Sequence, residues 1–358
     1  MSLATMGELG RPFGVIGVFS AEGHQEYREE HRRTWMHNGE PLGLLSRFVM
    51  RGNATGMRAE ARQNGDIVLL EALPAALPRS VGPLSMILPW FDYALSAWPT
   101  ISFLGKADDD VWIDTTSVAA QLHSVQSHLW QTLQVTEIYW GMMESFHWSV
   151  ATSSPIGFSY GIRDCRETER TWPSHGAHAS NNATLIGPFP FAKGALFFLS
   201  RGLASALVAQ DELVEDVART VQSGGRGGKL PPYEDVFVGA ALACTPLSTK
   251  AAILQAGGHG VYSEGWNFRV FNTSLIYHQR TKVPARITTV HNELFHRTAP
   301  ALNKEVAITC AGVYRSCTNI SWVRCTARNH QSTGIIDFKH RPSQLNVSNL
   351  RAAPHTST

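Results

Sequence analysis

The chain has 358 residues, of which 43% are hydrophobic and 17% are charged. This composition predicts a globular protein with a large core and excludes an intrinsically disordered chain. Because 31 Lys and Arg residues nearly balance 29 Asp and Glu residues, without a long block of like charge, nucleic acid is not expected as a partner.

Cysteines and glycosylation sequons bear on the cellular compartment. No two cysteines form a Cys-x-x-Cys pair, which argues against a zinc ribbon or a thioredoxin-like site. Their odd number leaves at least one thiol without an intrachain partner, and the sequence leaves the pairing open. The Asn-x-Ser/Thr sequons favour a secretory compartment. The cysteines are Cys165, Cys244, Cys310, Cys317 and Cys325, and the sequons begin at Asn53, Asn182, Asn272, Asn319 and Asn346.

No membrane segment is expected in this chain. The apolar run at residues 13–19 is far shorter than the ~20 residues that a spanning helix needs. It also lacks the charged flank and cleavage site of a signal peptide. Two alternatives stay open, a cytosolic protein or a protein whose N-terminal anchor is missing from this sequence.

The first part of the chain alternates between short apolar strands and helices. Pro89 is expected in or near the first turns of one of these helices, where a missing N–H is tolerated. Such alternation predicts an α/β fold with a mostly parallel central sheet flanked by helices. The predicted strands are residues 13–20, 66–70 and 101–105, and the predicted helices are residues 23–36 and 85–98.

The second part is less regular. Residues 149–185 are rich in Ser, Gly, His and Asn, which predicts a long surface insertion. An apolar strand is expected at 189–200, followed by a helix to about residue 213. A loop rich in Gly and Pro at 223–232 then precedes a helix at 233–243. The polar stretch beyond about residue 332 is expected to be frayed.

Three adjacent carboxylates, Asp108, Asp109 and Asp110, directly follow a predicted strand. Because like charges at a buried strand end repel one another, the triplet indicates a cation site. Hard oxygen ligands suit Mg²⁺ or Mn²⁺, and nucleotides bind at this edge of a parallel sheet. An acidic, solvated turn is the alternative.

Two further features have both a structural and a functional interpretation. Glu234 and Asp235 open a helix behind the Gly/Pro loop, so they either cap the helix or supply a general base. Arg28 and Arg32 share a helical face at a spacing of four. They either pair with neighbouring Glu29 and Glu30 or meet a diphosphate.

Taken in order along the chain, these motifs resemble glycosyltransferase family 31, the β-1,3-galactosyl- and β-1,3-N-acetylglucosaminyltransferases. The resemblance covers residues 13–295, and the segments at 85–98 and 271–278 look closest to the kinetoplastid branch. The motifs are Arg28-x-x-x-Arg32-x-Thr34-Trp35, Lys106-x-Asp108-Asp109-Asp110, Phe191-x-x-Gly194 with the strand to Ser200, and Glu234-Asp235-Val236-x-x-Gly239.

The resemblance implies a GT-A type fold, a single Rossmann-like domain over residues 13–296. Residues 1–12 are expected to form an N-terminal stub, and residues 297–358 are expected to form a C-terminal extension that is partly disordered. The implied reaction is metal-dependent, inverting transfer of galactose or N-acetylglucosamine from the UDP-sugar to a glycan acceptor, forming a β-1,3 linkage. The acceptor would be carried by a glycoprotein, glycolipid or phosphoglycan. The family normally works in the Golgi lumen with an N-terminal anchor.

The resemblance also implies roles for individual residues. Asp235 would be the general base, and Asp110 would ligate Mn²⁺ together with Asp108 and a late histidine. His278 is preferred to His291 for that ligand, because Arg280 and Lys282 follow it and could hold the diphosphate. The predicted substrate-binding residues are Ser20, Arg28, Arg32, Lys106, Asp108, Asp109, Gly194 and Glu234.

Two alternatives to an active transferase stay open. One is a catalytically inactive relative that binds a sugar or nucleotide, and the other is a metal-dependent phosphohydrolase. The intact Asp110 and Asp235 argue against the first. No scattered set of His and Asp ligands with a nucleophile supports the second.

Overall fold

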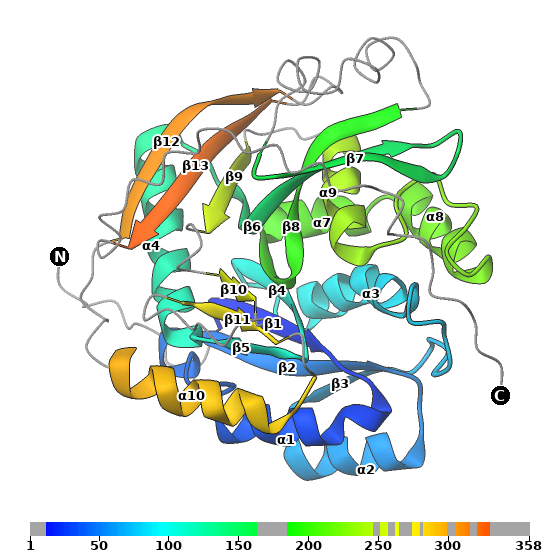
Figure 1. Cartoon of the computed structure of the whole chain (residues 1–358), viewed down its shortest axis with the longest axis vertical. Coiled ribbons are helices and arrows are strands. Elements are labelled where there is room, and N and C mark those ends of the chain that lie inside the picture. Colours follow the sequence, from blue (N-terminus) through cyan, green and yellow to red (C-terminus); the bar gives the residue numbers. More distant parts are fainter. Residues whose placement is uncertain are drawn as a thin grey trace.

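The computed structural model describes residues 12–162, 185–245, 251–256, 262–264, 274–279, 282–298, 306–315 and 321–329. Within these ranges a ten-stranded mixed sheet has helices on both faces, and a three-stranded sheet lies beside it (Figure 1). The strands are β1 (Gly14–Phe19), β2 (Leu44–Arg51), β3 (Ile67–Leu70), β4 (Phe103–Asp108), β5 (Val111–Ile113), β6 (Glu137–Ser149), β7 (Ser154–Tyr160), β8 (Leu185–Ser200), β9 (Ala251–Ala256), β10 (Tyr262–Glu264), β11 (Ile276–His278), β12 (Val306–Arg315) and β13 (Ser321–Asn329). The helices are α1 (Gln25–Arg33), α2 (Thr55–Asn64), α3 (Gly82–Ala97), α4 (Thr115–Leu133), α7 (Arg201–Val208), α8 (Asp211–Gln222), α9 (Glu234–Cys244) and α10 (Ala285–Thr298), with short 3-10 turns η1 (Glu22–His24) and η2 (Glu40–Leu42).

One half of the large sheet is parallel, in the order β3-β2-β1-β4. Strand β1 lies between β2 and β4 and is buried along its whole length, which explains its unbroken apolar run. The predicted strand at 66–70 corresponds to β3. Strand β2 was not predicted, because Ser46 and Arg47 interrupt its apolar pattern.

The other half of the sheet is mixed. Strand β8 is antiparallel to both β4 and β6, and the order continues through β9 and β13 to β12. Strand β7, inside the predicted insertion at 149–185, pairs with β6. Strands β12 and β13 lie in the predicted extension at 297–358, so both regions add strands to the central sheet.

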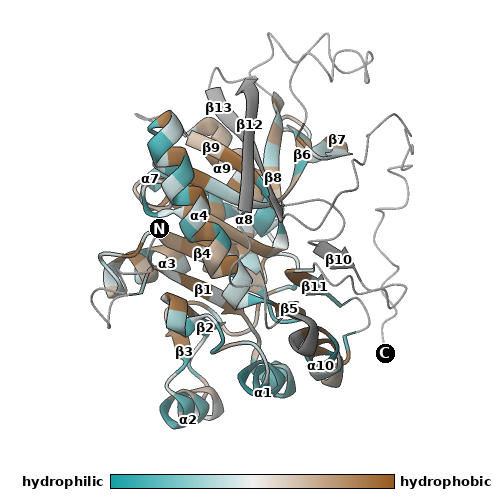
Figure 2. Ribbon diagram, turned by 90° about the vertical axis from the view of Figure 1, so that its left-hand side faces the viewer, coloured by the Kyte–Doolittle hydropathy of each residue, from teal (hydrophilic) through white to brown (hydrophobic). Residues whose placement is uncertain are grey.

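Two hydrophobic cores pack on the two faces of the sheet. Side chains alternate along β1, so Val15 and Phe19 belong to the core under α3, α7, α8 and α9. Ile16 and Val18 belong to the core that α1, α4 and α10 cover. Figure 2 shows the hydrophobic central strands and, at the periphery, the hydrophilic helix α1 and the mixed, partly hydrophilic helix α2. The predicted α/β fold with helices around a largely parallel sheet is confirmed, with five parallel and four antiparallel pairings in that sheet.

Two helix predictions need correction. Helix α3 begins at Gly82, so Pro89 lies in its interior and Pro83 occupies the first turn. The segment after β8 forms two helices, α7 and α8, with a break at residues 209–210. Among the described residues, no helix combines the length and the apolar character needed to cross a membrane.

Candidate active site

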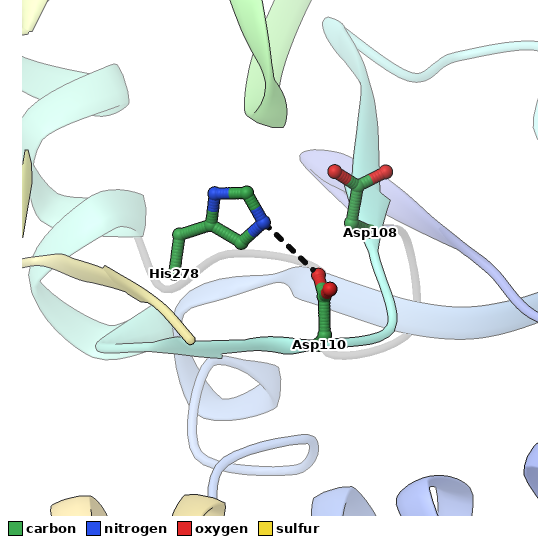
Figure 3. Close-up of side chains that lie close together, drawn as sticks. All are labelled: Asp108, Asp110 and His278. Atoms are coloured by element: carbon green, nitrogen blue, oxygen red, sulfur yellow. Dashed lines mark ion pairs between the residues drawn. The ribbon is translucent and has the colours of Figure 1, made fainter. Parts of the chain in front are cut away.

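The acidic triplet lies where β4 turns into β5. Asp108 is the last residue of β4, and Asp109 and Asp110 form the turn. The turn leaves the side chains of Asp108 and Asp110 pointing into the same space, as Figure 3 shows. The side chain of Asp109 instead meets His24, whose Nδ1 lies 2.8 Å from Asp109 Oδ2. The side chains of Asp108 and Asp110 therefore lie together, whereas the side chain of Asp109 lies apart from them, next to His24.

His278 reaches the triplet through strand pairing. Strand β11 is antiparallel to β5, and its register places His278 opposite Val111, the residue after Asp110. His278 Nε2 lies 3.2 Å from Asp110 Oδ1, an ion pair drawn in Figure 3. Lys282 Nζ lies 3.8 Å from Asp110 Oδ2. Asp108, Asp110 and His278 each offer a ligand atom, and these atoms lie within 4.8 Å of one another.

Electrostatics around the three side chains favour a cation. Burial raises the pKa of Asp108, the Lys106 ammonium opposes this, and the carboxylates of Glu234 and Asp110 add to the rise. Burial also works against ionisation of Asp110, but the hydrogen bond and charge of His278 hold its pKa below the usual value. Two carboxylates and an imidazole fit a divalent metal ion, which relieves the repulsion among the carboxylates.

Lys106 connects the triplet to α9. Its side chain is fully buried, and its ammonium donates hydrogen bonds to Asp108 Oδ1 at 2.6 Å and Glu234 Oε1 at 2.7 Å. The third hydrogen bond goes to the Gly194 carbonyl at 2.9 Å. Burial disfavours the charged amine, but the two carboxylates outweigh that effect and raise the pKa of Lys106. All three N–H donors of Lys106 are thus used by groups of the protein, two of them by the carboxylates of Asp108 and Glu234.

Asp235 lies at the start of α9, against the β8 backbone. Its Oδ2 accepts a hydrogen bond from the Gly194 N–H at 2.9 Å, and its Oδ1 accepts one from the Val236 N–H at 2.8 Å. Burial and the adjacent charge of Glu234 raise the pKa of Asp235 to about 7. A carboxylate with a pKa near neutrality is suited to accept a proton from a substrate hydroxyl.

The two glycines of the predicted motifs permit this arrangement. A Cβ on Gly194 would lie 2.8 Å from Glu234 Oε1 and 3.0 Å from Lys106 Nζ. A Cβ on Gly239 would lie 2.5 Å from the Pro190 carbonyl oxygen, because α9 packs directly on β8. Gly194 thus allows the contact between the carboxylates and β8, and Gly239 allows the close approach of the helix.

A cleft of about 390 Å³ brings the predicted residues together. Asp108, Gly194, Glu234, Asp235 and His278 all line it. Its wall also contains residues that were not among the predicted site residues. These are Glu144, Phe146, Phe158, Phe191, Lys193, Ala195, Tyr233 and Val236, of which Phe191, Lys193, Ala195, Tyr233 and Val236 stand in or beside the motifs.

Arg28 does not line this cleft. Its buried guanidinium donates to both carboxylate oxygens of Glu60, at 2.9 and 2.6 Å, and to Ser20 Oγ at 3.0 Å. Arg32 pairs with Asp66 at 2.7 Å and with Glu60 at 2.9 Å. The partners of the two arginines are therefore neither a diphosphate nor the neighbouring glutamates on the same helix. Carboxylates from distant segments pair with them instead, because a buried guanidinium needs close partners.

Two other predicted residues also lie elsewhere. Asp109 is held on the α1 side, where its carbonyl oxygen is 2.8 Å from His31 Nε2 and its side chain contacts His24. His291, the alternative metal ligand, lies on α10 with its Nδ1 3.2 Å from the indole nitrogen of Trp112. Arg280 lies outside the described residues.

Comparisons with known proteins agree with the motifs. The model of the galactosyltransferase family matches residues 26–245, more than half of the chain. Probable beta-1,3-galactosyltransferase 3 of Arabidopsis thaliana is 25% identical over 219 residues, which are 57% of this chain and 46% of that protein. Probable beta-1,3-galactosyltransferase 1 of the same plant is 28% identical over 147 residues, covering 37% of this chain and 35% of that protein. The chain thus spans half or less of the length of these relatives.

Solved structures show a partial likeness. A galactosyltransferase, LgtC, solved with donor and acceptor sugar analogues, has a TM-score of 0.38 at 10% identity, covering 78% of this chain and 96% of that one. A glycosyltransferase involved in glycosylation of the major capsid of PBCV-1 has a TM-score of 0.37 at 8% identity, covering 79% of this chain and 100% of that one. The match to the family model, which spans the triplet and the Glu-Asp-Val motif, shows that the chain belongs to the galactosyltransferase family, glycosyltransferase family 31.

Proposed function

We propose that the protein transfers galactose or N-acetylglucosamine from a UDP-sugar to a hydroxyl group of a glycan acceptor, with inversion and formation of a β-1,3 linkage. One observation carries the proposal. The side chains of Asp108, Asp110 and His278 form what we call the acidic cluster. Two of them, Asp108 and His278, line the same cleft as Asp235, whose pKa is raised to about 7. A diphosphate site and a proton acceptor are thereby combined in one cleft, as glycosyl transfer requires.

The donor side of the cleft would hold Mn²⁺ through Asp108, Asp110 and His278. When bound, such an ion offsets the negative charge that develops on the departing diphosphate. Lys106 keeps Asp108 and Glu234 in place from behind, through hydrogen bonds of 2.6 and 2.7 Å. Lys282, 3.8 Å from Asp110, adds positive charge at this side.

The acceptor side is organised by Asp235. In its ionised form Asp235 would take the proton of the acceptor hydroxyl while that oxygen bonds to the anomeric carbon. The bond from the anomeric carbon to the UDP oxygen breaks on the opposite face, which inverts the configuration. The N–H groups of Gly194 and Val236 hold the carboxylate at 2.9 and 2.8 Å, so its orientation is set before substrate binds.

A panel of UDP-sugars tests the proposal, with UDP release measured with and without acceptor glycans. We expect Mn²⁺-dependent release that is stimulated by acceptor, with UDP-galactose or UDP-N-acetylglucosamine as the preferred donor. A metal-dependent phosphohydrolase would instead cleave the diphosphate of the UDP-sugar to UMP and a sugar phosphate, at the same rate with and without acceptor. An inactive relative would bind UDP, as measured by calorimetry, but would release no UDP from any UDP-sugar.

The compartment and the acceptor complete the proposal. We propose the Golgi lumen, where glycoprotein, glycolipid or phosphoglycan acceptors are available, and this is supported by the sequons and the family. Among the sequons, Asn53 lies in the described part of the chain and is exposed between β2 and α2. Expression with any native upstream sequence should yield protein that loses mass with an endoglycosidase.

A further inference from the structure

Four aromatic side chains, which we call the aromatic wall, line the cleft: Phe146, Phe158, Phe191 and Tyr233. These residues come from β6, β7 and β8 and from the position that precedes α9. Strand β7 belongs to the segment at 149–185 that is predicted from the sequence as a surface insertion. The aromatic wall is therefore assembled by tertiary structure from four separate elements.

The aromatic wall has a buried layer and an exposed layer. Phe146 and Phe191 are buried, with ring centroids 6.0 Å apart at an interplanar angle of 85°. Phe158 packs on Phe191 with centroids 6.3 Å apart and an angle of 53°. Phe158 is still 37% exposed and Tyr233 is 47% exposed. The buried Phe191 ring thus supports Phe158, and Phe158 and Tyr233 both remain available to a ligand.

The chemistry around the aromatic wall restricts what can cover it. Carboxylates of Glu144, Glu234 and Asp235 and the ammonium of Lys193 line the same cleft, with Lys193 Nζ 3.4 Å from Glu144 Oε1. A purely apolar ligand would leave these charged groups without hydration. A pyranose fits better, because one face carries only C–H groups and the edge carries hydroxyls. The volume of about 390 Å³ is within the range of small-molecule sites.

We propose that Phe158 and Tyr233 form the acceptor subsite, where the C–H face of a hexopyranoside lies on the aromatic rings and a hydroxyl at its edge faces Asp235. This inference rests on the proposed function and specifies its acceptor side. The donor diphosphate would be held by the acidic cluster of Asp108, Asp110 and His278, of which Asp108 and His278 line the same cleft. The ligand class is a glycan that ends in a hexopyranose with an unhindered C–H face, such as a β-galactoside.

Kinetics of Phe158→Ala and Tyr233→Ala with methyl β-D-galactopyranoside as acceptor test the assignment. Each variant should raise the acceptor KM about three- to tenfold, the range expected for losing one aromatic contact. The donor KM and the acceptor-independent hydrolysis of the UDP-sugar should not change. Phe158→Tyr, which keeps the ring, should restore the acceptor KM. Trp130→Ala is the control, because Trp130 is 51% exposed on α4 and lies outside the cleft.

Either of two kinetic results would overturn the subsite. If the donor KM and the acceptor-independent hydrolysis change instead, the aromatic wall holds the donor. If no Michaelis constant changes in the Ala variants, the aromatic wall has no part in binding. Both results can be read from the same rate measurements on folded protein.

Binding without turnover separates this inference from the proposed function. Saturation-transfer NMR of methyl β-D-galactopyranoside with Asp235→Asn protein, saturated with UDP and Mn²⁺, should give a signal that Phe158→Ala removes. If wild type transfers no sugar yet this signal is present and depends on Phe158, the proposed function fails and the subsite stands. If wild type transfers sugar and the signal is the same with Phe158→Ala, the subsite fails and the proposed function stands.

Discussion

The backbone N–H of Gly194 donates a hydrogen bond to Asp235 Oδ2 at 2.9 Å, and the carbonyl of the same glycine accepts one from Lys106 Nζ at 2.9 Å. One residue of β8 therefore orients both the candidate base and the lysine that holds Asp108 and Glu234. No side chain is needed for either contact, and there is no room for one. This explains why a glycine stands at this point of the motif.

Gly194→Ala should reduce activity with little loss of stability. The new Cβ would be 2.8 Å from Glu234 Oε1 and 3.0 Å from Lys106 Nζ, so Glu234 and the lysine that holds Asp108 must shift. Displacements of this size can lower kcat up to about 100-fold. Steady-state kinetics and thermal unfolding measure the two effects. Gly56→Ala on α2, where no atom lies within 4 Å of the added Cβ, is the control, and equal kcat values for the two variants would contradict the role of Gly194.

Gly239→Ala should instead destabilise the fold. Its Cβ would meet the Pro190 carbonyl oxygen at 2.5 Å and Phe191 Cβ at 2.6 Å, and this backbone contact cannot be relieved by a rotamer change. Overpacking of this kind costs about 1–3 kcal/mol. Urea unfolding should show the loss in the free energy of unfolding, while Gly56→Ala gains up to about 1 kcal/mol from its higher helix propensity. A Gly239→Ala protein as stable as wild type would mean that α9 does not pack on β8 as described.

The pH dependence of kcat/KM should follow the ionisation of Asp235. Only the carboxylate can accept a proton, and the pKa of Asp235 is raised to about 7, so kcat/KM should rise with pH and level off above about 7. Asp235→Asn should remove this dependence and lower kcat at least ~100-fold, with UDP affinity nearly unchanged by calorimetry. Glu234→Gln should be milder and should move the midpoint to lower pH, because the Glu234 charge raises the Asp235 pKa. If Glu234→Gln is the inactive variant and Asp235→Asn stays active, the two roles are exchanged.

Ionisation of Asp235 should also lower the free energy of unfolding of the metal-free protein. Its folded-state pKa of about 7 lies above the ordinary value of 3.8. The folded state therefore binds more protons than the unfolded state between these values, and stability falls as pH rises from about 4 to 7. The Asp235→Asn variant has no such loss. The free energy of unfolding of the variant minus that of wild type should therefore increase from about pH 4 to about pH 7 and stay constant above it. Thermal unfolding in EDTA at several pH values measures this difference, and a difference that does not vary with pH would contradict the assigned pKa.

Metal binding should depend on His278 and not on His291. Removal of Mn²⁺ with EDTA should abolish transfer, and His278→Ala should weaken Mn²⁺ binding at least ~10-fold because one of three ligands is lost. His291→Ala is the matched control on a histidine that contacts Trp112 instead. Calorimetric titration of Mn²⁺ into both variants makes the comparison. Full activity in EDTA would remove the metal from the mechanism.

Arg28→Ala should act on stability rather than on donor affinity. Loss of the buried guanidinium leaves Glu60 with Arg32 alone, and the free energy of unfolding should fall by about 3 kcal/mol, the low end for breaking a buried ion pair. Arg33→Ala on the same helix removes an exposed cation paired with Glu30 and should cost less than about 1 kcal/mol. Denaturant unfolding and calorimetry with UDP separate the two quantities. Unchanged stability with lost UDP affinity would restore Arg28 to the nucleotide site.

Local patterns were sufficient for much of the fold and for the centre of the candidate site. The apolar run of β1 and the acidic triplet after β4 are contiguous in sequence, and burial and charge repulsion act on them directly. The same holds for Glu234 and Asp235 at the start of α9. Each of these features depends on neighbouring residues, so its position could be predicted without knowing what packs against it.

Tertiary structure alone decided which distant groups complete these features. The sequence favoured His278 but left His291 as an alternative, because the position of His278 depends on the register of β11 against β5. Arg28 was assigned to a nucleotide, whereas Glu60 of another helix pairs with it. Phe158 joins the cleft only because β7 pairs with β6. Pairing of segments far apart in the chain is set by packing and by the hydrogen bonds of the whole sheet, which no local pattern encodes.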